Sequence, residues 1–203
     1  MLINLILPHN YRIGYSNIES LSYVVLLYIS VIATHNCYFS PDLTNTINLI
    51  FRYFFIDLFF LPPKKVDIIF HHITVIFLIY LSSIYDLPYP LIETIARIVL
   101  KFETTNIFLC TSYFFKRIKK HVSTPIVHYA SNVSNILLVS SFIKYRCYNI
   151  LIHILYNKDL YNELDEYNNF VAQYTYNCVN AFFLLNCYWL FMLIKMANKN
   201  YRT

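Results

Sequence analysis

Long blocks of apolar residues, with the charged residues mostly confined to the stretches between them, constrain this fold more than any other feature. A helix must present about 20 mostly apolar residues to cross roughly 30 Å of hydrocarbon. Of the 203 residues, 58% are hydrophobic and only 13% are charged, whereas a soluble domain carries about 25% charged residues. We therefore expect an all-α polytopic transmembrane helical bundle with about six spans. The expected spans are 20–38, 46–62, 66–85, 89–115, 125–146 and 170–195.

The fourth and fifth segments are less regular than the others. The fourth is long and carries charges, which is typical of a surface-lying piece followed by a short span. The fifth leaves a tail, 147–156, that either extends the helix or lies in the interface. Lys144 and Arg146 close this segment, and we expect both to reach the headgroup layer with their long side chains. We divide the chain into an N-terminal segment with the first span (1–45), a membrane domain (46–199) and a short cytosolic tail (200–203).

The charges between the segments predict the orientation of the chain. Lys and Arg occupy alternate connections and Asp and Glu the others, so the positive-inside rule places the basic connections and both termini in the cytosol. Basic residues at segment ends indicate topology rather than a nucleic-acid surface. The basic residues are Lys64, Lys65, Lys116, Arg117, Lys119, Lys120, Lys195, Lys199 and Arg202. The acidic residues are Asp42, Asp86, Asp159, Glu163, Asp165 and Glu166.

The single glycine of the chain, Gly14, excludes several kinds of site. Phosphate-binding loops and dinucleotide fingerprints need two or three glycines so that the backbone can approach a phosphate. Helix contacts of the GxxxG kind need two. The five cysteines include no CxxC pair, which favours small buried hydrophobic residues over a metal or redox site. We expect no metal and no cofactor.

Two adjacent histidines in the third segment are the strongest candidates for chemistry. Asp67, His71 and Thr74 share one helical stripe, and His72 lies about 100° around the helix. We expect Asp67 to accept a hydrogen bond from His71 and so to fix its tautomer. Three interpretations stay open: a contact with another helix or a lipid headgroup, a general base, or a metal ligand, which needs further partners.

Other polar residues inside the segments are expected to face the bundle interior or a water-filled cavity, because ionisable groups are costly in hydrocarbon. Tyr53 and Asp57 lie four residues apart in the second segment, and Glu103 and Asn106 lie in the fourth. The sixth segment carries an amide-rich face, which is more often a contact between helices than a catalytic set. That face contains Gln173, Asn177 and Asn180, followed by Asn186 and Trp189.

Together these fragments resemble the TLC domain, the membrane domain of ceramide synthases and of several lipid-related proteins. The resemblance covers about residues 50–199 and rests on five places that follow the order of the family. They are Tyr53 with Asp57; Asp67 with His71, His72 and Thr74; Glu103-Thr104-Thr105-Asn106; Arg146; and Leu185-Asn186-Cys187-Tyr188-Trp189 followed by Ile194-Lys195.

The chain also departs from the ceramide synthases. The proline that the family carries near Glu103 is missing, and Asp86 is the only aspartate between His72 and Glu103. By resemblance, the acidic pair of that acyl-transfer chemistry is therefore absent. The chain looks closer to TLC domain-containing proteins that influence membrane lipid composition. The resemblance implies membrane lipids as partners and the endoplasmic reticulum or another internal membrane as location, and it leaves the oligomeric state open.

Two hypotheses about function follow from the resemblance and the polar residues. In the first, which the missing acidic pair favours, the protein is not an enzyme but binds or senses lipids or regulates membrane lipid composition. Its lipid cavity is then lined by Tyr53, Asp57, Thr74, Glu103, Asn106, Asn186 and Trp189. In the second, the protein is an acyltransferase with acyl-CoA as co-substrate, and its catalytic residues are His71, His72 and Asp67. A purely structural or trafficking adaptor is the third interpretation.

Overall fold

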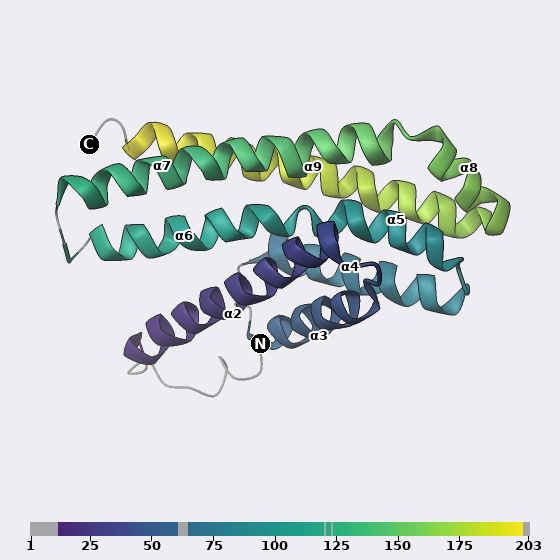
Figure 1. Cartoon of the computed structure of the whole chain (residues 1–203), viewed down its shortest axis with the longest axis horizontal. Coiled ribbons are helices and arrows are strands. Elements are labelled where there is room, and N and C mark those ends of the chain that lie inside the picture. Colours follow the sequence, from purple (N-terminus) through teal and green to yellow (C-terminus); the bar gives the residue numbers. More distant parts are fainter. Residues whose placement is uncertain (1–11, 61–64, 120, 123, 201–203) are drawn as a thin grey trace.

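The chain forms a bundle of helices in the computed structural model, which describes residues 12–60, 65–119, 121–122 and 124–200 (Figure 1). These residues contain no β-strand. Lys64, Lys120 and Arg202, which the orientation argument used, lie outside the described residues. The helices are α2 (Arg12–Phe39), α3 (Thr44–Phe60), α4 (Val66–Ile84), α5 (Tyr89–Leu100), α6 (Glu103–Lys119), α7 (Pro125–Ser141), η2 (Phe142–Tyr148), η3 (Leu151–Leu155), α8 (Lys158–Tyr167) and α9 (Asn169–Asn200).

Helices α7 and α9 run along the length of the bundle beside α6 and α5, and α2 crosses below them obliquely (Figure 1). Helix α6 packs against α7 and α2, and α3 packs against α4. Helix α9 contacts α4, α7, α8 and both π-helical stretches, so it joins the early and late parts of the chain. The segments that carry the predicted polar residues therefore meet in the middle of one bundle.

Local sequence signals explain where several helices begin and end. Thr124 caps α7 by accepting a hydrogen bond from the backbone N–H of Val127, and Pro125 occupies the first helical position, where a missing N–H costs nothing. Asn157 caps α8 in the same way. After α4 the chain turns at Asp86, whose φ of 47° lies in the left-handed region. Glycine usually takes such a position, and aspartate is one of the few residues that tolerate it.

The fourth predicted segment is divided into two helices, which agrees with the expectation of two successive pieces. Helices α5 and α6 are separated by a turn at Lys101 and Phe102 and follow one another along the bundle (Figure 1). Helix α5 buries Leu91, Ile98 and Leu100 in the core. Its position at the membrane surface stays a prediction. The charged pair on α5, Glu93 and Arg97, has a structural role.

Arg97 of α5 closes the C-terminal end of α2. Its guanidinium donates from Nη1 to the carbonyl of Cys37 at 2.8 Å and from Nη2 to the carbonyl of Ser40 at 2.8 Å. Nη2 also donates to Glu93 at 2.6 Å. The last carbonyls of a helix have no partners within it, so Arg97 satisfies groups that would otherwise be left unpaired at this end of α2.

The fifth predicted segment continues well beyond residue 146. Helix α7 runs on through the π-helical stretches η2 and η3 to Leu155, so the tail extends the helix instead of lying in the interface. Each π-helical turn rotates the residues that follow it relative to an α-helix, and such turns occur frequently at functional sites. Here η2 contains Arg146, which it directs into the bundle.

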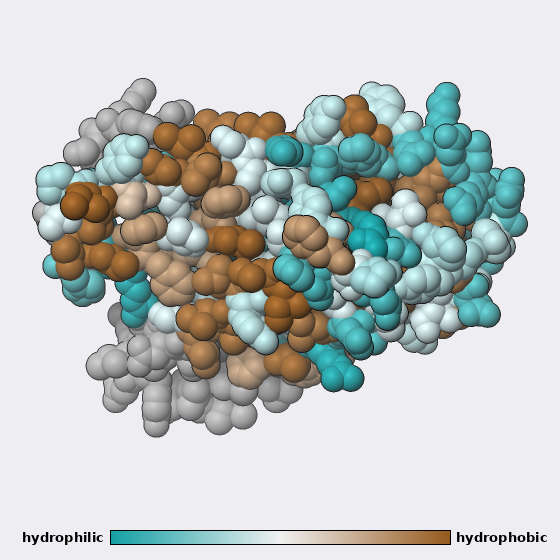
Figure 2. Space-filling model, viewed as in Figure 1, coloured by the Kyte–Doolittle hydropathy of each residue, from teal (hydrophilic) through white to brown (hydrophobic). Residues whose placement is uncertain are grey.

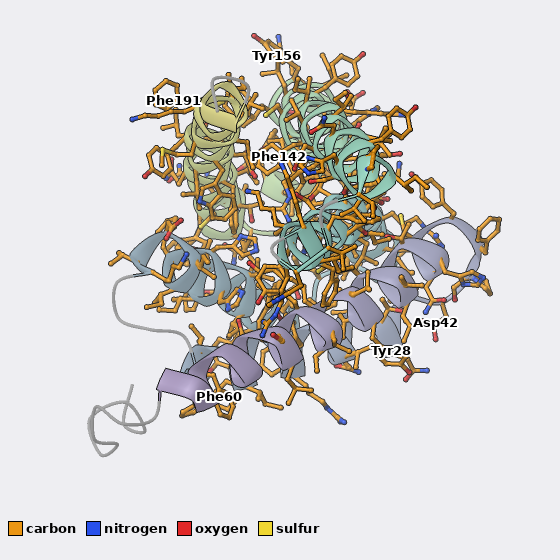
Figure 3. All side chains as sticks on the ribbon, turned by 90° about the vertical axis from the view of Figure 1, so that its left-hand side faces the viewer. Tyr28, Asp42, Phe60, Phe142, Tyr156 and Phe191 are labelled. Carbon is orange, nitrogen blue, oxygen red and sulfur yellow. The ribbon has the colours of Figure 1, made fainter. Side chains whose placement is uncertain are left out.

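Each of the six predicted segments is helical where the structure describes it, and among the described residues four helices are long and apolar enough to cross a membrane on their own. Large apolar side chains cover the outside of the bundle. Phe191 is 61% exposed and Tyr28 is 65% exposed, and both point away from the core, whereas Phe142 points into it (Figure 3). A soluble protein rarely exposes so much contiguous apolar surface. The four helical stretches are Ser20–Phe39, Val66–Ile84, Pro125–Leu155 and Asn169–Lys195.

Polar residues gather at one end of the molecule. Figure 2 shows a hydrophilic right-hand end and an apolar band across the centre and left. The acidic helix α8 lies at this polar end (Figure 1). In the loop between α2 and α3, Asp42 accepts hydrogen bonds from the backbone N–H of Thr44 and from the hydroxyl of Tyr89, each at 2.8 Å. These hydrogen bonds from Thr44 and Tyr89 lower the pKa of Asp42 below its ordinary value.

Candidate functional site

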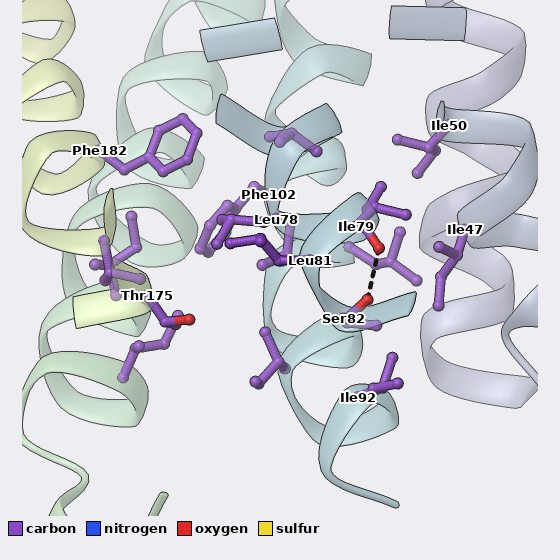
Figure 4. A pocket seen from close by; sticks show the side chains of 18 of the residues that line it. Ile47, Ile50, Leu78, Ile79, Leu81, Ser82, Ile92, Phe102, Thr175 and Phe182 are labelled. Carbon is purple, nitrogen blue, oxygen red and sulfur yellow. Dashed lines mark hydrogen bonds between the residues drawn. The ribbon is translucent and has the colours of Figure 1, made fainter. Parts of the chain in front are cut away.

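An apolar cavity of about 160 Å³ lies inside the bundle. Figure 4 shows Ile47 and Ile50 of α3 on one side of it and Thr175 and Phe182 of α9 on the other, with residues of α4 between them. Ser82 also faces this space, but its hydroxyl donates to the carbonyl of Ile79 at 2.7 Å. Because that hydroxyl is already satisfied, this wall of the cavity behaves as an apolar one.

The lining also includes four strongly polar side chains. They come from four different helical elements, α4, α6, η2 and α9. Glu103 and Arg146 are each 6% exposed and Asn186 is 3% exposed, so these groups are buried in the protein. Buried polar groups are stable only when they are paired or hydrogen-bonded, and most of their partners can be identified. The four residues are His71, Glu103, Arg146 and Asn186.

Arg146 is the centre of a hydrogen-bond chain between η2 and α6. Its Nε donates to the hydroxyl of Thr105 at 2.6 Å, and its Nη2 donates to Oδ1 of Asn106 at 2.8 Å. The guanidinium also lies over the ring of Phe142 at 5.4 Å and over that of Trp189 at 5.8 Å, within the range of cation–π attraction. Arg146 therefore does not extend to the headgroup layer, as its position near the predicted segment end had led us to expect.

Glu103 carries the same chain onward to α2. Its Oε2 accepts from the amide of Asn106 at 2.7 Å and from the hydroxyl of Ser30 at 3.1 Å. Asn106 thus bridges the guanidinium of Arg146 and the carboxylate of Glu103 with its two ends. One continuous network joins α2, α6 and η2, and both charged groups belong to it.

The two histidines have different surroundings. The His71 ring packs edge-on against the rings of Phe54, Phe182 and Trp189, with centroids between 5.1 and 5.7 Å apart. His72 is 5% exposed, and its ring stacks on the ring of Phe54 with the two centroids 4.4 Å apart. His71 lines the cavity and His72 does not.

The carboxylate that faces a histidine is Asp57, not Asp67. Nδ1 of His72 lies 3.6 Å from Oδ2 of Asp57, which is too long for a direct hydrogen bond. Oδ2 of Asp67 instead accepts from the indole N–H of Trp189 at 2.7 Å. The expected pairing of Asp67 with His71 is therefore wrong, because a strong donor on α9 takes the Asp67 carboxylate.

Three buried polar atoms around the histidines have no hydrogen-bond partner among the described residues: Nδ1 of His71, Nδ1 of His72 and Oδ1 of Asn186. Asn186 uses its other end, because its amide donates to the carbonyl of Phe182 at 2.8 Å. An unsatisfied buried polar atom is rare in native proteins and indicates strain, a functional role or a bound group. Two of the three residues, His71 and Asn186, line the cavity.

Of the seven residues expected to line a lipid cavity, Glu103 and Asn186 do so. The prediction is wrong for the other five, which are not among the lining residues: Tyr53, Asp57, Thr74, Asn106 and Trp189. Tyr53 lies beside His72, with ring centroids 6.3 Å apart. Thr74 is buried, but its hydroxyl donates to the carbonyl of Phe70, which gives it a local role. Asn180 likewise donates to the carbonyl of Tyr176 and is absent from the cavity lining.

Sequence reasoning missed several members of the site. Ser30 and Thr105 are small hydroxyl residues that gave no distinctive signal, although each binds a charged group. Phe54 and Phe182 enclose His71 and look like any other aromatic residue of an apolar segment. In the described part of the chain, no three His, Cys, Asp or Glu side chains are grouped so that they could hold a metal ion.

The chain matches the model of a known protein family. The family model of the TLC domain matches residues 14–195, which is most of the chain. Searches of curated proteins and of solved structures find no match. The match includes all the helices that line the cavity and every residue of the hydrogen-bond network. This chain, a multi-pass membrane protein, belongs to the TLC-domain family.

Proposed function

We propose that the protein binds one lipid chain inside its helical bundle, with the alkyl chain in the apolar cavity and the head group against His71, Arg146 and Asn186. The observation that carries this proposal is the composition of the lining. Apolar side chains of α3, α4, α5 and α9 make up most of it, and a small set of polar groups completes it. Sites for small ligands have this composition, with mostly apolar walls and a few polar groups that fix orientation.

The volume of the cavity favours a narrow occupant. Pockets for drug-sized ligands measure about 300–1,000 Å³, and this cavity measures about 160 Å³. An apolar cavity near this size stays dry and accepts small apolar molecules. The cavity therefore has room for part of one methylene chain, but not for the two chains of a phospholipid. Membrane lipids are therefore the proposed partners, and the proposed role is lipid binding or the regulation of membrane lipid composition.

We propose the endoplasmic reticulum or another internal membrane as the location, with the basic ends of the helices in the cytosol. Lys116, Arg117 and Lys119 form the last turn of α6, at the end of the bundle opposite the acidic helix α8 (Figure 1). This separation agrees with the positive-inside rule. It supports an orientation in which α8 lies on the side of the membrane away from the cytosol.

Photocrosslinking in a bilayer tests the lipid proposal. The protein would be reconstituted into phosphatidylcholine vesicles that contain a single-chain lipid with a diazirine in its alkyl chain. We expect modified peptides from the facing walls, around Leu78 of α4 and around Thr175 and Phe182 of α9. An excess of the same lipid without the diazirine should suppress this labelling. Modification confined to outward-facing residues such as Ile73 and Phe191, which are 53% and 61% exposed, would contradict the proposal.

An acyltransferase is the second candidate, because His71 lies on the cavity and His72 faces Asp57. In that reaction a histidine removes a proton from an amine or hydroxyl acceptor, the acceptor attacks the thioester carbonyl of acyl-CoA, and the CoA thiolate leaves. Incorporation of labelled acyl-CoA into lipid would be measured in membranes from a host that lacks its own ceramide synthases. Incorporation that disappears in the His71→Ala, His72→Ala double variant, at equal abundance, would establish the enzyme. Incorporation no higher than that of control membranes would eliminate it.

A further inference from the structure

The charges around the cavity restrict the head group that it can receive. Among the described residues, the charged side chains that line the cavity are Glu103 and Arg146, and they have opposite signs. Glu103 accepts hydrogen bonds from Ser30 and Asn106, and Arg146 donates to Thr105 and Asn106. The polar lining is therefore balanced in charge without a ligand. A charged head group would add an uncompensated ion to a buried site, which is strongly unfavourable.

The unpaired atoms of two residues that line the cavity, His71 and Asn186, define what the head group must offer. Because the Asn186 amide N–H₂ already donates to the carbonyl of Phe182, Oδ1 of Asn186 is fixed as an acceptor. That oxygen is buried without a partner and therefore needs a donor. Nδ1 of His71 is also unpaired, and a neutral imidazole presents either an N–H or a lone pair there. The fitting group is small and neutral, and it both donates and accepts.

We infer that the ligand is a neutral single-chain lipid whose head group is a hydroxyl. The hydroxyl hydrogen is donated to Oδ1 of Asn186, and the hydroxyl oxygen lies toward His71 and Arg146. The inference rests on the proposed lipid-binding function and names the ligand class for that site. A long-chain alcohol contains the required chemistry in its simplest form.

Other common head groups leave this site unsatisfied. An ionised carboxylate only accepts hydrogen bonds, so it provides no donor for Asn186, and it adds a negative charge beside Glu103. A primary ammonium group only donates, and it adds a positive charge beside Arg146. A hydrocarbon without a head group leaves both Asn186 and His71 unpaired. In this series the alcohol is the head group that is neutral, donates a hydrogen bond and accepts one.

Four probes with the same diazirine-bearing alkyl chain test the inference: an alcohol, a carboxylic acid, a primary amine and an alkane. Each would be present at the same mole fraction in phosphatidylcholine vesicles that contain the full chain. The measured quantity is labelling of the cavity peptides around Leu78 and Phe182. We expect the alcohol to label these peptides about tenfold more than the acid, the amine or the alkane, since one satisfied buried acceptor changes binding by about that factor.

The outcomes separate the inference from the proposed function. Cavity labelling that is at least as strong with the acid or the amine as with the alcohol would overturn the inference and leave lipid binding intact. Absence of cavity labelling with every probe would overturn both. The ratio between the probes is measured within one wild-type preparation, so the test does not depend on how well a variant folds.

A matched pair of variants localises the effect. Asn186→Leu removes the unpaired acceptor and should reduce alcohol labelling about tenfold, to the level of the alkane. Asn180→Leu is the control, because Asn180 lies on the same helix, makes the same hydrogen bond to the carbonyl four residues earlier and is absent from the cavity lining. Its preference for the alcohol should equal that of the wild type. An Asn186→Leu protein that keeps the preference would contradict the inference.

Discussion

Replacement of Arg146 by methionine should lower the free energy of unfolding by about 3–5 kcal/mol. The substitution keeps most of the side-chain volume but removes a buried cation. It takes away the donors on which Thr105 and Asn106 rely, and it leaves the carboxylate of Glu103 buried without a balancing charge. Equilibrium unfolding in detergent micelles or bicelles, compared between the two proteins, measures the loss.

Two further variants show whether the effect comes from the buried charge. Lys144→Met removes a cation two residues earlier in η2, where the side chain is exposed, so it should change stability by less than about 0.5 kcal/mol. Adding Glu103→Gln to Arg146→Met removes the remaining charge and should restore part of the loss. Equal stability of the Arg146→Met and Lys144→Met proteins would show that the buried network contributes nothing.

Leu78→Trp should reduce labelling of the cavity by a single-chain lipid at least about tenfold. Leu78 lies on the cavity wall between α3 and α9 (Figure 4), so the larger indole ring occupies the space that the alkyl chain needs. Crosslinking yield at the peptides of α9, normalised to the amount of folded protein, measures the effect.

Control variants distinguish a filled cavity from general damage. Ile73→Trp adds the same ring to the outer face of the same helix, where the side chain is 53% exposed, and should leave labelling unchanged. Thr175→Phe fills the cavity from α9, the opposite wall, and should reproduce the loss. Overpacking a core costs about 1–3 kcal/mol of stability. Loss of labelling in both Leu78→Trp and Thr175→Phe is therefore stronger evidence for a filled cavity than loss in either variant alone. Normal labelling in both filled variants would contradict the proposed site.

The fold was predictable because hydrocarbon imposes simple rules on a chain. Apolar length identified the helices, and charge in the connections identified the two ends of the bundle. The division of the fourth segment and the extension of the fifth were among the expected alternatives, but the position of the break at Lys101 and the π-helical turns of η2 were not predictable. A π-helical turn is stabilised by packing against neighbouring helices, and no local residue pattern announces it. Because the sequence did not reveal the π-helical turns, Arg146 was expected at the membrane surface. It is instead buried in the core.

The ionisable members of the site were predictable, but its small hydroxyl and aromatic members and its pairings between helices were not. His71, His72, Asp57 and Asp67 were identified as ionisable groups inside apolar segments, and they do cluster. Helical spacing relates residues of the same helix only, so it predicted a hydrogen bond between Asp67 and His71. In the folded protein the partner of Asp67 is Trp189, which lies on a different helix. Partners between helices depend on packing that a single sequence does not display.

The central claim is that one lipid chain occupies the cavity, and the lipid that remains with the purified protein tests it most directly. The wild type and the Leu78→Trp variant would be purified from the same membranes and compared by native mass spectrometry. We predict a wild-type population that carries one single-chain lipid per polypeptide and a Leu78→Trp population that lacks it. The same bound lipids in both proteins, or none in either, would contradict lipid binding in this cavity.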